Sequence, residues 1–414
     1  MTRRYLMVIP VPAYRNGPDS FEIESAFAQH LRTLRAKLGP LAHTLVVAAP
    51  ELSAEQRAGQ NLETVRADEG ILFRAMFPAS LGGLRYYQRL PGIMKVLSEE
   101  IEKADVVHAG PSDLNRPFEF PALLMGASRG KKTISVTDID SRNSAKMNYV
   151  TGRWSLREYV TTKLIHANLH HLQHTIAARR FSLVMLKGRA LADDYGKGRP
   201  NVKNFLDSAF ETCHLIPPDR LEQKASAVLQ RSAPLHAIYF GRLTGYKGID
   251  HMLRALRVAL DLGANVKLSI VGSGEDREAL ERLAGELKLQ DRVAFLGAVR
   301  FGEPLFELLY DAHVLLAAPL SEDTPRSALD AFASGQSLIA YDTYYYRDLA
   351  QGGAPVELVK WLDAKAMGET LARVESNRER LAEQLRSARV FAEPNTQEAW
   401  LDTRVEWTKS LFEQ

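Results

Sequence analysis

Cysteine is almost absent from this 414-residue chain, in which Cys213 is the only one. A single thiol can form neither an intramolecular disulfide nor a cysteine metal cluster, so a disulfide-stabilised fold and a cysteine-based zinc domain are excluded. The chain also lacks an apolar run of the ~20 residues that a membrane-spanning helix needs. Its N-terminus, MTRRYLMVIPVPAY, has too short an apolar part for a signal peptide and no small-residue cleavage site. We therefore expect a cytoplasmic protein.

A strong overall charge is lacking too, since the net charge is +3. The two halves nevertheless differ: residues 1–210 hold 29 Lys and Arg against 20 Asp and Glu, and the remainder holds 24 against 30. This asymmetry favours two domains with different partners. No nucleic-acid-binding motif accompanies the basic half, so we expect no nucleic acid. The basic half could instead contact the inner face of an anionic membrane peripherally, bind a phosphorylated acceptor, or face water.

What the chain does contain is an alternation of short apolar runs and helical patterns. The apolar runs predict strands at 6–12, 44–50, 104–110, 133–139, 235–243, 266–274, 292–299 and 337–342. This rhythm is typical of mostly parallel sheets with helices on both faces. Because it restarts after residue 210, it predicts an α/β chain of two Rossmann-like, doubly wound domains that face a cleft. In such sheets, ligands bind beyond the carboxyl ends of the strands.

The predicted boundaries follow from the same patterns. Residues 1–210 form the first domain and residues 235–395 the second. The weakly patterned segment 211–234 is predicted to be a linker, since Pro217-Pro218 can form neither a helix interior nor a central strand. Residues 396–414 are predicted to form an amphipathic helix that packs back on the first domain.

Two glycine-rich turns follow predicted strands of the second domain. FGRLTGYKG (240–248) places Arg242 and Lys247 among three glycines, which suits a diphosphate. The alternative is a surface loop with two solvated cations. VGSGED (271–276) places Gly272 and Gly274 before a helix start, where free amides favour anions. The alternative is a turn that needs glycine only for its geometry.

The stretch LSEDTPRSALD (320–330) has the features of a helix start. Thr324 is the predicted N-cap, Pro325 fits the first helical position, and Gly335 suits the position after the helix end. Capping alone does not account for Asp330, which lies among apolar and small residues, where a carboxylate is costly unless it is paired or bound. Together with Glu322 in the preceding loop, Asp330 can face one space beyond the strand end, where two carboxylates suit the vicinal hydroxyls of a sugar or ribose.

Four patterns occur in order in the second half: GRLTGYKG, VGSGED, DRVAFLG and the two acids of LSEDTPRSALD, eight residues apart. In these patterns the second half resembles the donor-binding domain of retaining glycosyltransferases of the GT-B fold, family 4 type, also called glycosyl transferases group 1. The first half matches only in rhythm and in scattered features such as DVVHAG. The resemblance implies a transferase that moves a sugar from a UDP- or GDP-type nucleotide-diphosphate sugar to a hydroxyl of a saccharide, a lipid-linked glycan or a small molecule. It implies no metal and no cofactor beyond the sugar donor.

The resemblance also implies which residues of the second domain bind the donor. Arg242 and Lys247 would hold the diphosphate, and Gly272 and Gly274 would border the nucleotide. The backbone of residues 296–300 would meet the base. The full set of implied substrate-binding residues is Gly17, Arg242, Lys247, Gly272, Gly274, Leu296, Val299, Glu322, Thr324, Arg326, Ser327 and Asp330.

The acids depart from the family pattern in part. Glu322 matches the acid near the transferred sugar and is an implied catalytic residue. Asp330 stands at the ribose-binding position, one methylene shorter than the usual Glu. Asp323-Thr324-Pro325 replaces the common Gly-Phe-Gly. Because Pro325 has no N–H, Arg326 or Ser327 could take over a phosphate contact.

The first half departs further. Gly17 stands alone where the family often has a glycine pair, and Thr137 and Asp138 lie where many members present a histidine to the donor sugar. Asp138 is therefore the first-domain candidate for a catalytic contact. His108 ends another strand, but a satisfied buried histidine is the alternative that we favour.

Several patterns remain open. His166, His170 and His174 have a spacing that can bind zinc, although a polar helix face is the favoured interpretation. Asp138-Ile139-Asp140 mimics a metal-binding D-x-D, a tripeptide common by chance. Segments 84–97 and 156–164 could lie on a membrane surface or be partly buried helices. A GT-B-fold sugar-nucleotide epimerase and a non-catalytic nucleotide-sugar-binding relative remain the rival functions.

Overall fold

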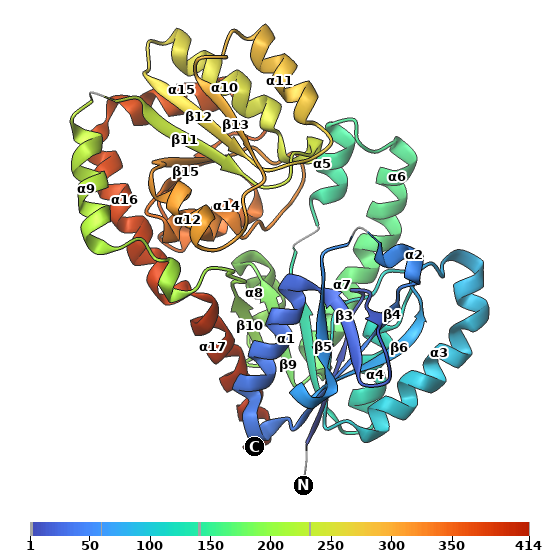
Figure 1. Ribbon diagram of the computed structural model, residues 1–414. Coiled ribbons are helices and arrows are strands. Elements are labelled where there is room, and N and C mark those ends of the chain that lie inside the picture. Colours follow the sequence, from blue (N-terminus) through green and yellow to red (C-terminus); the bar gives the residue numbers. More distant parts are fainter. Residues whose placement is uncertain (1–2, 59, 140–141, 232, 414) are drawn as a thin grey trace. The chain divides into compact units, whose positions relative to one another are not determined.

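The computed structural model describes residues 3–58, 60–139, 142–231 and 233–413 (Figure 1). The chain forms two compact units. Unit 1 comprises Met1–Asp138, Val160–Phe205 and Leu401–Gln414, and unit 2 comprises Ile139–Tyr159 and Leu206–Trp400. Each unit has its own parallel sheet with helices against it, so the predicted architecture of two doubly wound α/β domains is confirmed.

Unit 1 contains, within its described residues, a seven-stranded parallel sheet in the order β10-β9-β8-β7-β1-β4-β6. Its strands are β1 (Arg4–Val8), β4 (Thr44–Glu51), β6 (Ile71–Pro78), β7 (Val106–Ala109), β8 (Lys132–Thr137), β9 (Leu183–Lys187) and β10 (Val202–Phe205). Leu6, Val107 and Val184 are fully buried in this sheet. Strands covered on both faces are apolar along their whole length, which explains the unbroken apolar runs of the sequence.

The longer helices of unit 1 are α1 (Ser25–Leu38), α3 (Gly83–Lys103), α4 (Glu119–Ser128), α7 (Ala167–Arg180) and α8 (Arg189–Gly196). Shorter elements are η1 (Gly39–Leu41), α2 (Ala54–Arg57), η2 (Ala67–Glu69), the π-turn η3 (Thr162–His166) and α6 (Leu156–Thr161), which crosses the boundary between the units. Ile93, Leu97 and Ile101 of α3 recur every four residues and pack into the core of unit 1. The spacing places them on one helix face, so the opposite face of α3 is left to solvent.

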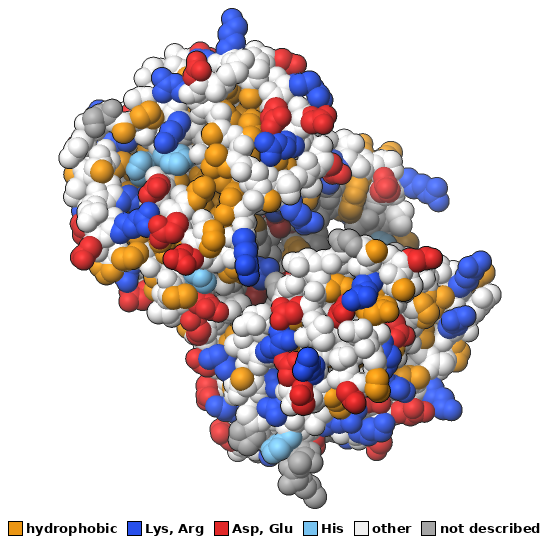
Figure 2. Space-filling model, in the orientation of Figure 1, with side chains coloured by type: hydrophobic (Ala, Val, Ile, Leu, Met, Phe, Trp, Pro, Cys, Tyr) orange, Lys and Arg blue, Asp and Glu red, His pale blue; other side chains and the backbone are white. Residues whose placement is uncertain are grey.

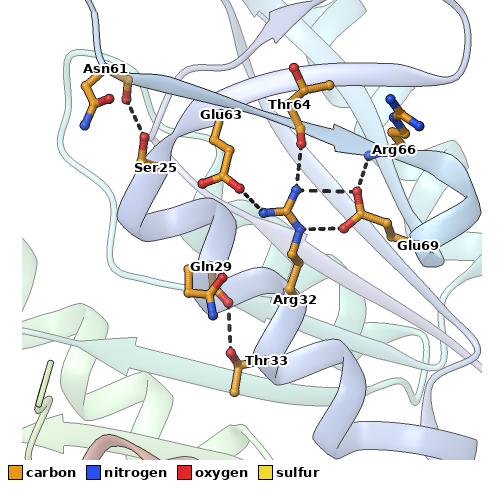
Figure 3. Close-up of polar contacts among 9 residues, drawn as sticks. All are labelled: Ser25, Gln29, Arg32, Thr33, Asn61, Glu63, Thr64, Arg66 and Glu69. Atoms are coloured by element: carbon orange, nitrogen blue, oxygen red, sulfur yellow. Dashed lines mark hydrogen bonds and ion pairs between the residues drawn. The ribbon is translucent and has the colours of Figure 1, made fainter. Parts of the chain in front are cut away.

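A small antiparallel sheet of unit 1 is fixed to α1 through Arg32 (Figure 3). The sheet consists of β2 (Tyr14–Arg15), β3 (Ser20–Glu24) and β5 (Leu62–Arg66). The Arg32 guanidinium donates to the carboxylates of Glu63 and Glu69 and, at 2.6 Å, to the carbonyl oxygen of Thr64. Because β3 pairs with both β2 and β5, this network also holds the β2–β3 turn that carries Gly17.

Unit 2 contains, among the described residues, a six-stranded parallel sheet in the order β13-β12-β11-β14-β15-β16. Its strands are β11 (Leu235–Phe240), β12 (Val266–Val271), β13 (Val293–Gly297), β14 (Val314–Ala317), β15 (Ser337–Tyr341) and β16 (Val356–Val359). The chain proceeds outward from β11 in one direction and then returns to β14 to proceed in the other. This is the doubly wound order in which a ligand crevice lies outside the carboxyl ends of the two central strands.

The helices of unit 2 are α5 (Ser144–Val150), α9 (Pro218–Leu229), α10 (Ile249–Asp261), α11 (Arg277–Glu286), α12 (Glu303–Tyr310), α13 (Ser327–Ala333), α14 (Tyr344–Gln351), α15 (Ala364–Ser376) and α16 (Arg378–Ala392). Short 3₁₀ turns are η4 (Thr212–His214), η5 (Gly245–Lys247) and η6 (Glu393–Asn395). Ile249, Met252, Leu253 and Leu256 bury one face of α10 at helical spacing, so α10 is one of the amphipathic helices that cover the sheet.

The structure departs from the predicted boundaries at two places. The predicted linker 211–234 is wrong, because half of it is α9, which packs into the core of unit 2 through Leu221, Ala225 and Val228. Pro218 is the first residue of this helix, a position that tolerates proline because its N–H would have no partner there. Residues 139–159, predicted to belong to the first domain, are part of unit 2.

The C-terminal helix packs on unit 1, as predicted. It comprises α17 (Gln397–Lys409) and η7 (Ser410–Phe412), and Leu401–Gln414 belong to unit 1. Asp402 forms an ion pair with Lys37 of α1, and the Arg3 guanidinium lies 4.1 Å from the centre of the Phe412 ring. These contacts join the two ends of the sequence within one unit.

Candidate functional site

The two loops that leave β11 and β14 approach each other closely. Gly248 has a φ of 64°, and a Cβ atom there would lie 2.0 Å from the carbonyl oxygen of Ala318. No other residue would fit without moving the backbone. The Leu320 N–H donates to the Tyr246 carbonyl oxygen at 2.7 Å, so the loops are also joined by a hydrogen bond. The structure therefore brings the predicted 242–247 and 320–330 segments together at the switch point of the sheet.

Both predicted diphosphate cations contact Tyr246. Arg242, an exposed residue, donates from Nη2 to the Tyr246 hydroxyl at 3.1 Å. The Lys247 ammonium lies 4.9 Å from the centre of the Tyr246 ring and forms an ion pair with Asp323. The guanidinium carbon of Arg153 lies 5.2 Å from the same ring centre. Tyr246 thus gathers three cations at the end of β11, and sequence reasoning named only two of them.

The loop after β14 is held from three sides. The Pro319 carbonyl oxygen accepts a hydrogen bond from Trp361 Nε1 at 3.0 Å, and the Pro325 carbonyl oxygen accepts one from the Tyr345 hydroxyl at 3.0 Å. Ser321 Oγ accepts one from Asn148 Nδ2 at 3.1 Å. Glu322 follows Ser321 and is half-buried. A carboxylate on a loop fixed in this way can orient a bound sugar without first ordering its own backbone.

Helix α13 begins later than predicted. Its first residue is Ser327 and Arg326 occupies the N-cap position, so Thr324 as N-cap and Pro325 as first helical residue are wrong. Ala328 N–H already closes a turn onto the Pro325 carbonyl at 3.4 Å, which places Pro325 in a turn before the helix. Gly335, with a φ of 64°, follows the helix end as predicted.

Asp330 lies inside the first turn of α13 and is only 4% exposed. Its Oδ1 has no hydrogen-bond partner in the described part of the chain. Burial raises the pKa of the carboxyl to about 7, although the charge of Arg326 lowers it. A buried carboxylate whose oxygen has no donor is unfavourable on its own, and two ribose hydroxyls would supply such donors.

The residues predicted to border the nucleotide lie at the neighbouring strand ends. A Cβ atom on Gly272 would lie 1.8 Å from the Gly241 carbonyl oxygen, and one on Gly274 would lie 2.2 Å from the Leu243 carbonyl oxygen. The Gly272 N–H also donates to Gly297 at 2.7 Å. These glycines are therefore needed for the close approach of the two turns. This agrees with the alternative interpretation, in which the turn needs glycine for its geometry. Leu296 and Val299 lie at the end of β13 and just beyond it, and Leu296 is exposed.

In unit 1, the predicted residues fall on separate features. Gly17 lies in the β2–β3 turn, whereas Thr137 and Asp138 lie at the carboxyl end of β8. Thr137 Oγ1 lies 3.1 Å from His174 Nε2, which brings a histidine to this strand end although none stands there in the sequence. His108 is buried and bonded to the Tyr5 hydroxyl at 2.7 Å, and burial lowers its pKa to about 3. This agrees with the favoured interpretation of His108 as a satisfied core histidine.

The candidate metal-binding patterns do not form a shared site in the described residues. His170 contacts Asp113 at 3.2 Å and His174 contacts Thr137, so their ring nitrogens have different partners. Asp140 of the D-x-D lies outside the described residues. The donor atoms of Glu211, Cys213 and His214 do lie within 4.8 Å of one another. The Nδ1 of that histidine, however, accepts the Glu211 N–H at 3.0 Å, so only its other nitrogen is open to a ligand.

Comparison with known families decides what this arrangement belongs to. Residues 222–390 match the family model of the glycosyl transferases group 1. This segment is a group 1 glycosyl transferase domain. The match covers the part of unit 2 that carries Arg242, Lys247, Glu322 and Asp330, and it confirms the resemblance to the glycosyl transferases group 1.

Two curated relatives match parts of this chain. An uncharacterized glycosyltransferase of Methanocaldococcus jannaschii is 37% identical over 102 residues, which are 25% of this chain and 26% of that protein. The poly(glycerol-phosphate) alpha-glucosyltransferase of Bacillus subtilis is 26% identical over 169 residues, 40% of this chain and 25% of that protein. The chain therefore spans about a quarter of the length of these relatives.

Solved structures resemble the whole chain. Anabaena Alr3699/HepE in complex with UDP has a TM-score of 0.64 at 16% identity, with 98% of this chain and 99% of that chain covered. Sucrose-phosphate synthase of Thermosynechococcus elongatus has a TM-score of 0.65 at 15% identity, with 99% and 100% covered. At these identities the likeness establishes the fold, which is GT-B.

Proposed function

We propose that the chain is a retaining glycosyltransferase that takes its sugar from a nucleotide-diphosphate donor bound in unit 2. The observation that carries this proposal is that the loop with Arg242 and Lys247 meets the loop with Glu322, which leads into the helix with Asp330, at the switch point of a group 1 domain. Cations suit a diphosphate, and carboxylates suit the hydroxyls of a sugar or ribose. One elongated ligand that contains a diphosphate and sugar hydroxyls would therefore supply a partner for all four side chains.

Each residue has a role in the proposed reaction. Arg242 and Lys247 stabilise the negative charge that grows on the departing diphosphate. Glu322 orients the transferred sugar, and Asp330 accepts hydrogen bonds from the ribose hydroxyls. On the family's usual account, the acceptor hydroxyl attacks from the leaving-group face. Bond formation to the acceptor then accompanies departure of the nucleotide diphosphate, which takes up the hydroxyl proton, and the sugar keeps its anomeric configuration.

The donor is proposed to be a UDP or GDP sugar. Support for uridine comes from Anabaena Alr3699/HepE, whose structures contain UDP and UDP-glucose. We propose that unit 1 supplies the acceptor side, with Asp138 at the end of β8 as its candidate contact to the reacting groups.

The acceptor is proposed to be reached at an anionic membrane surface through unit 1. α3 exposes Leu84 (77%) and Tyr87 (44%) as well as the nearby Arg85 and Arg89. Figure 2 shows hydrophobic and basic side chains side by side along the edge that α3 forms. Leu164, before α7, is 62% exposed. Basic and apolar side chains on one helical surface suit anionic lipid headgroups and the acyl boundary below them. No helix in the described residues has the length and hydrophobicity to cross a bilayer.

The experiment that tests the proposal starts with binding. UDP and GDP are added separately to the protein, and the change in Tm is measured. We expect one of them to raise Tm, because a ligand that binds only the folded state stabilises it. The matching nucleotide sugar is then offered with candidate acceptors, and the product's anomeric configuration is read by NMR. No shift with either nucleotide would contradict the donor site. Binding without transfer or hydrolysis would leave a nucleotide-sugar-binding relative.

A further inference from the structure

A segment from the first half of the sequence contacts both loops of the switch point. Residues 139–159 belong to unit 2 and include α5. Asn148, which is 7% exposed, donates from Nδ2 to Ser321 Oγ at 3.1 Å and to the Ser144 carbonyl at 2.9 Å. A buried side-chain hydrogen bond of this kind has a defined geometry. The segment is therefore attached to the loop that carries Glu322.

The same asparagine fixes the turn that follows α5. The backbone N–H groups of Arg153 and Trp154 both donate to the Asn148 carbonyl oxygen, at 2.9 and 3.0 Å. Arg153 leaves this turn toward Tyr246, and its guanidinium carbon lies 5.2 Å from the ring centre. Asn148 thus binds the Ser321 loop through its side-chain amide and the Arg153 turn through its backbone carbonyl oxygen.

Three cations surround Tyr246 and only one of them is neutralised. Lys247 pairs with Asp323, whereas in the described residues no carboxylate lies within ion-pair distance of Arg153 or Arg242. Like charges gathered around one ring repel each other and raise the energy of the empty site. A ligand with two or more negative charges removes that repulsion. The cluster therefore fits a diphosphate better than a neutral sugar or a single carboxylate.

We propose that Arg153 is a third cation of the diphosphate site, supplied by segment 139–159 and positioned by Asn148. This inference rests on the proposed function. It adds that a residue outside the matched segment 222–390 completes the donor site. An arginine stacked on an aromatic ring is held near its working position, and its planar fork can then donate two hydrogen bonds to phosphate oxygens.

The test compares two arginines of the same segment. Arg153→Ala removes the proposed contact. Arg157→Ala is the matched control, because Arg157 is exposed, lies on the same segment and makes no hydrogen bond or ion pair among the described residues. Both variants lose one positive charge, so a general change in protein charge affects them equally. Isothermal titration of each full-length variant uses UDP, GDP and inorganic pyrophosphate as probes, and circular dichroism checks the fold.

We expect Arg153→Ala to weaken binding of the diphosphate and of pyrophosphate about tenfold, the usual effect of losing one charge-assisted hydrogen bond, and Arg157→Ala to leave both unchanged. Asn148→Ala, which releases the segment, should cause a smaller loss in the same direction. Equal affinities of the two arginine variants would overturn the inference and leave the proposed function standing. A wild-type protein that binds none of the three probes would overturn both.

Discussion

Replacing Asp330 by asparagine should stabilise the protein and weaken its donor binding at the same time. The folded carboxyl has a pKa of about 7, against 3.8 for an ordinary aspartate. The folded state therefore favours the protonated form, and the wild type loses stability as the pH rises from 3.8 to 7. A difference of about three pKa units corresponds to about 4 kcal/mol, and this loss is complete above pH 7.

Asparagine has nearly the shape of aspartate but never carries the charge. Its amide would still lack a partner at the position of Oδ1, so we expect a net gain of about 2–3 kcal/mol in the free energy of unfolding at pH 8. At pH 4 most of the electrostatic gain is absent while the cost of the partner-less amide remains, so the variant should be about 1 kcal/mol less stable than the wild type. Urea unfolding of both proteins at the two pH values measures this difference.

Nucleotide affinity should move the other way. The proposed ribose contacts are hydrogen bonds to a charged acceptor, so the variant should bind UDP or GDP about 10- to 100-fold more weakly. Asp291→Asn, the same chemical change at an exposed residue, is the control and should alter neither quantity. Equal stability of wild type and Asp330→Asn at pH 8 would refute the electrostatic reasoning. A more stable variant with unchanged affinity would refute the ribose contact alone.

Three further predictions concern single side chains. Asp323→Asn should strengthen UDP or GDP binding about three- to tenfold by titration calorimetry, because Lys247 no longer has to leave an ion pair; unchanged or weaker binding would contradict this. Lys224→Met should raise the free energy of unfolding by about 1–3 kcal/mol at pH 7. Burial lowers the pKa of this amine from 10.5 to about 7, so the wild type loses stability as the pH falls through that range. Identical urea midpoints of the two proteins would contradict this prediction. Leu164→Ser should reduce sedimentation of the protein with phosphatidylglycerol vesicles several-fold, whereas Val390→Ser, at an equally exposed site of unit 2, should not. Equal sedimentation of the two variants would contradict the proposed membrane contact of unit 1.

The parts of the fold that local patterns determine could be predicted. Buried parallel strands are apolar along their length, so the runs at 235–243 and 266–274 predict β11 and β12, two neighbouring strands of unit 2. The residues that follow those strands could be assigned to a common edge, because parallel strands end on the same side. The donor-side residues Arg242, Lys247 and Glu322 were reachable in this way.

Other features depend on contacts that no local pattern records. The pairing of Asn148 with Ser321 joins residues far apart in the sequence, and nothing in segment 139–159 marks it as part of unit 2. Pro217-Pro218 favours a linker, whereas Leu221 and Val228, at helical spacing, indicate the buried face of the helix that the structure has there. The start of α13 was missed because the turn at Pro325 competes with the helix for the same residues.

The most direct measurement is a crystal structure of the protein with UDP or GDP bound, whichever raises its Tm. The account predicts the diphosphate between Arg242 and Lys247, with the Asp323 ion pair broken and the ribose hydroxyls within hydrogen-bond distance of Asp330. A nucleotide bound elsewhere, or one whose ribose leaves Asp330 without a partner, would contradict it.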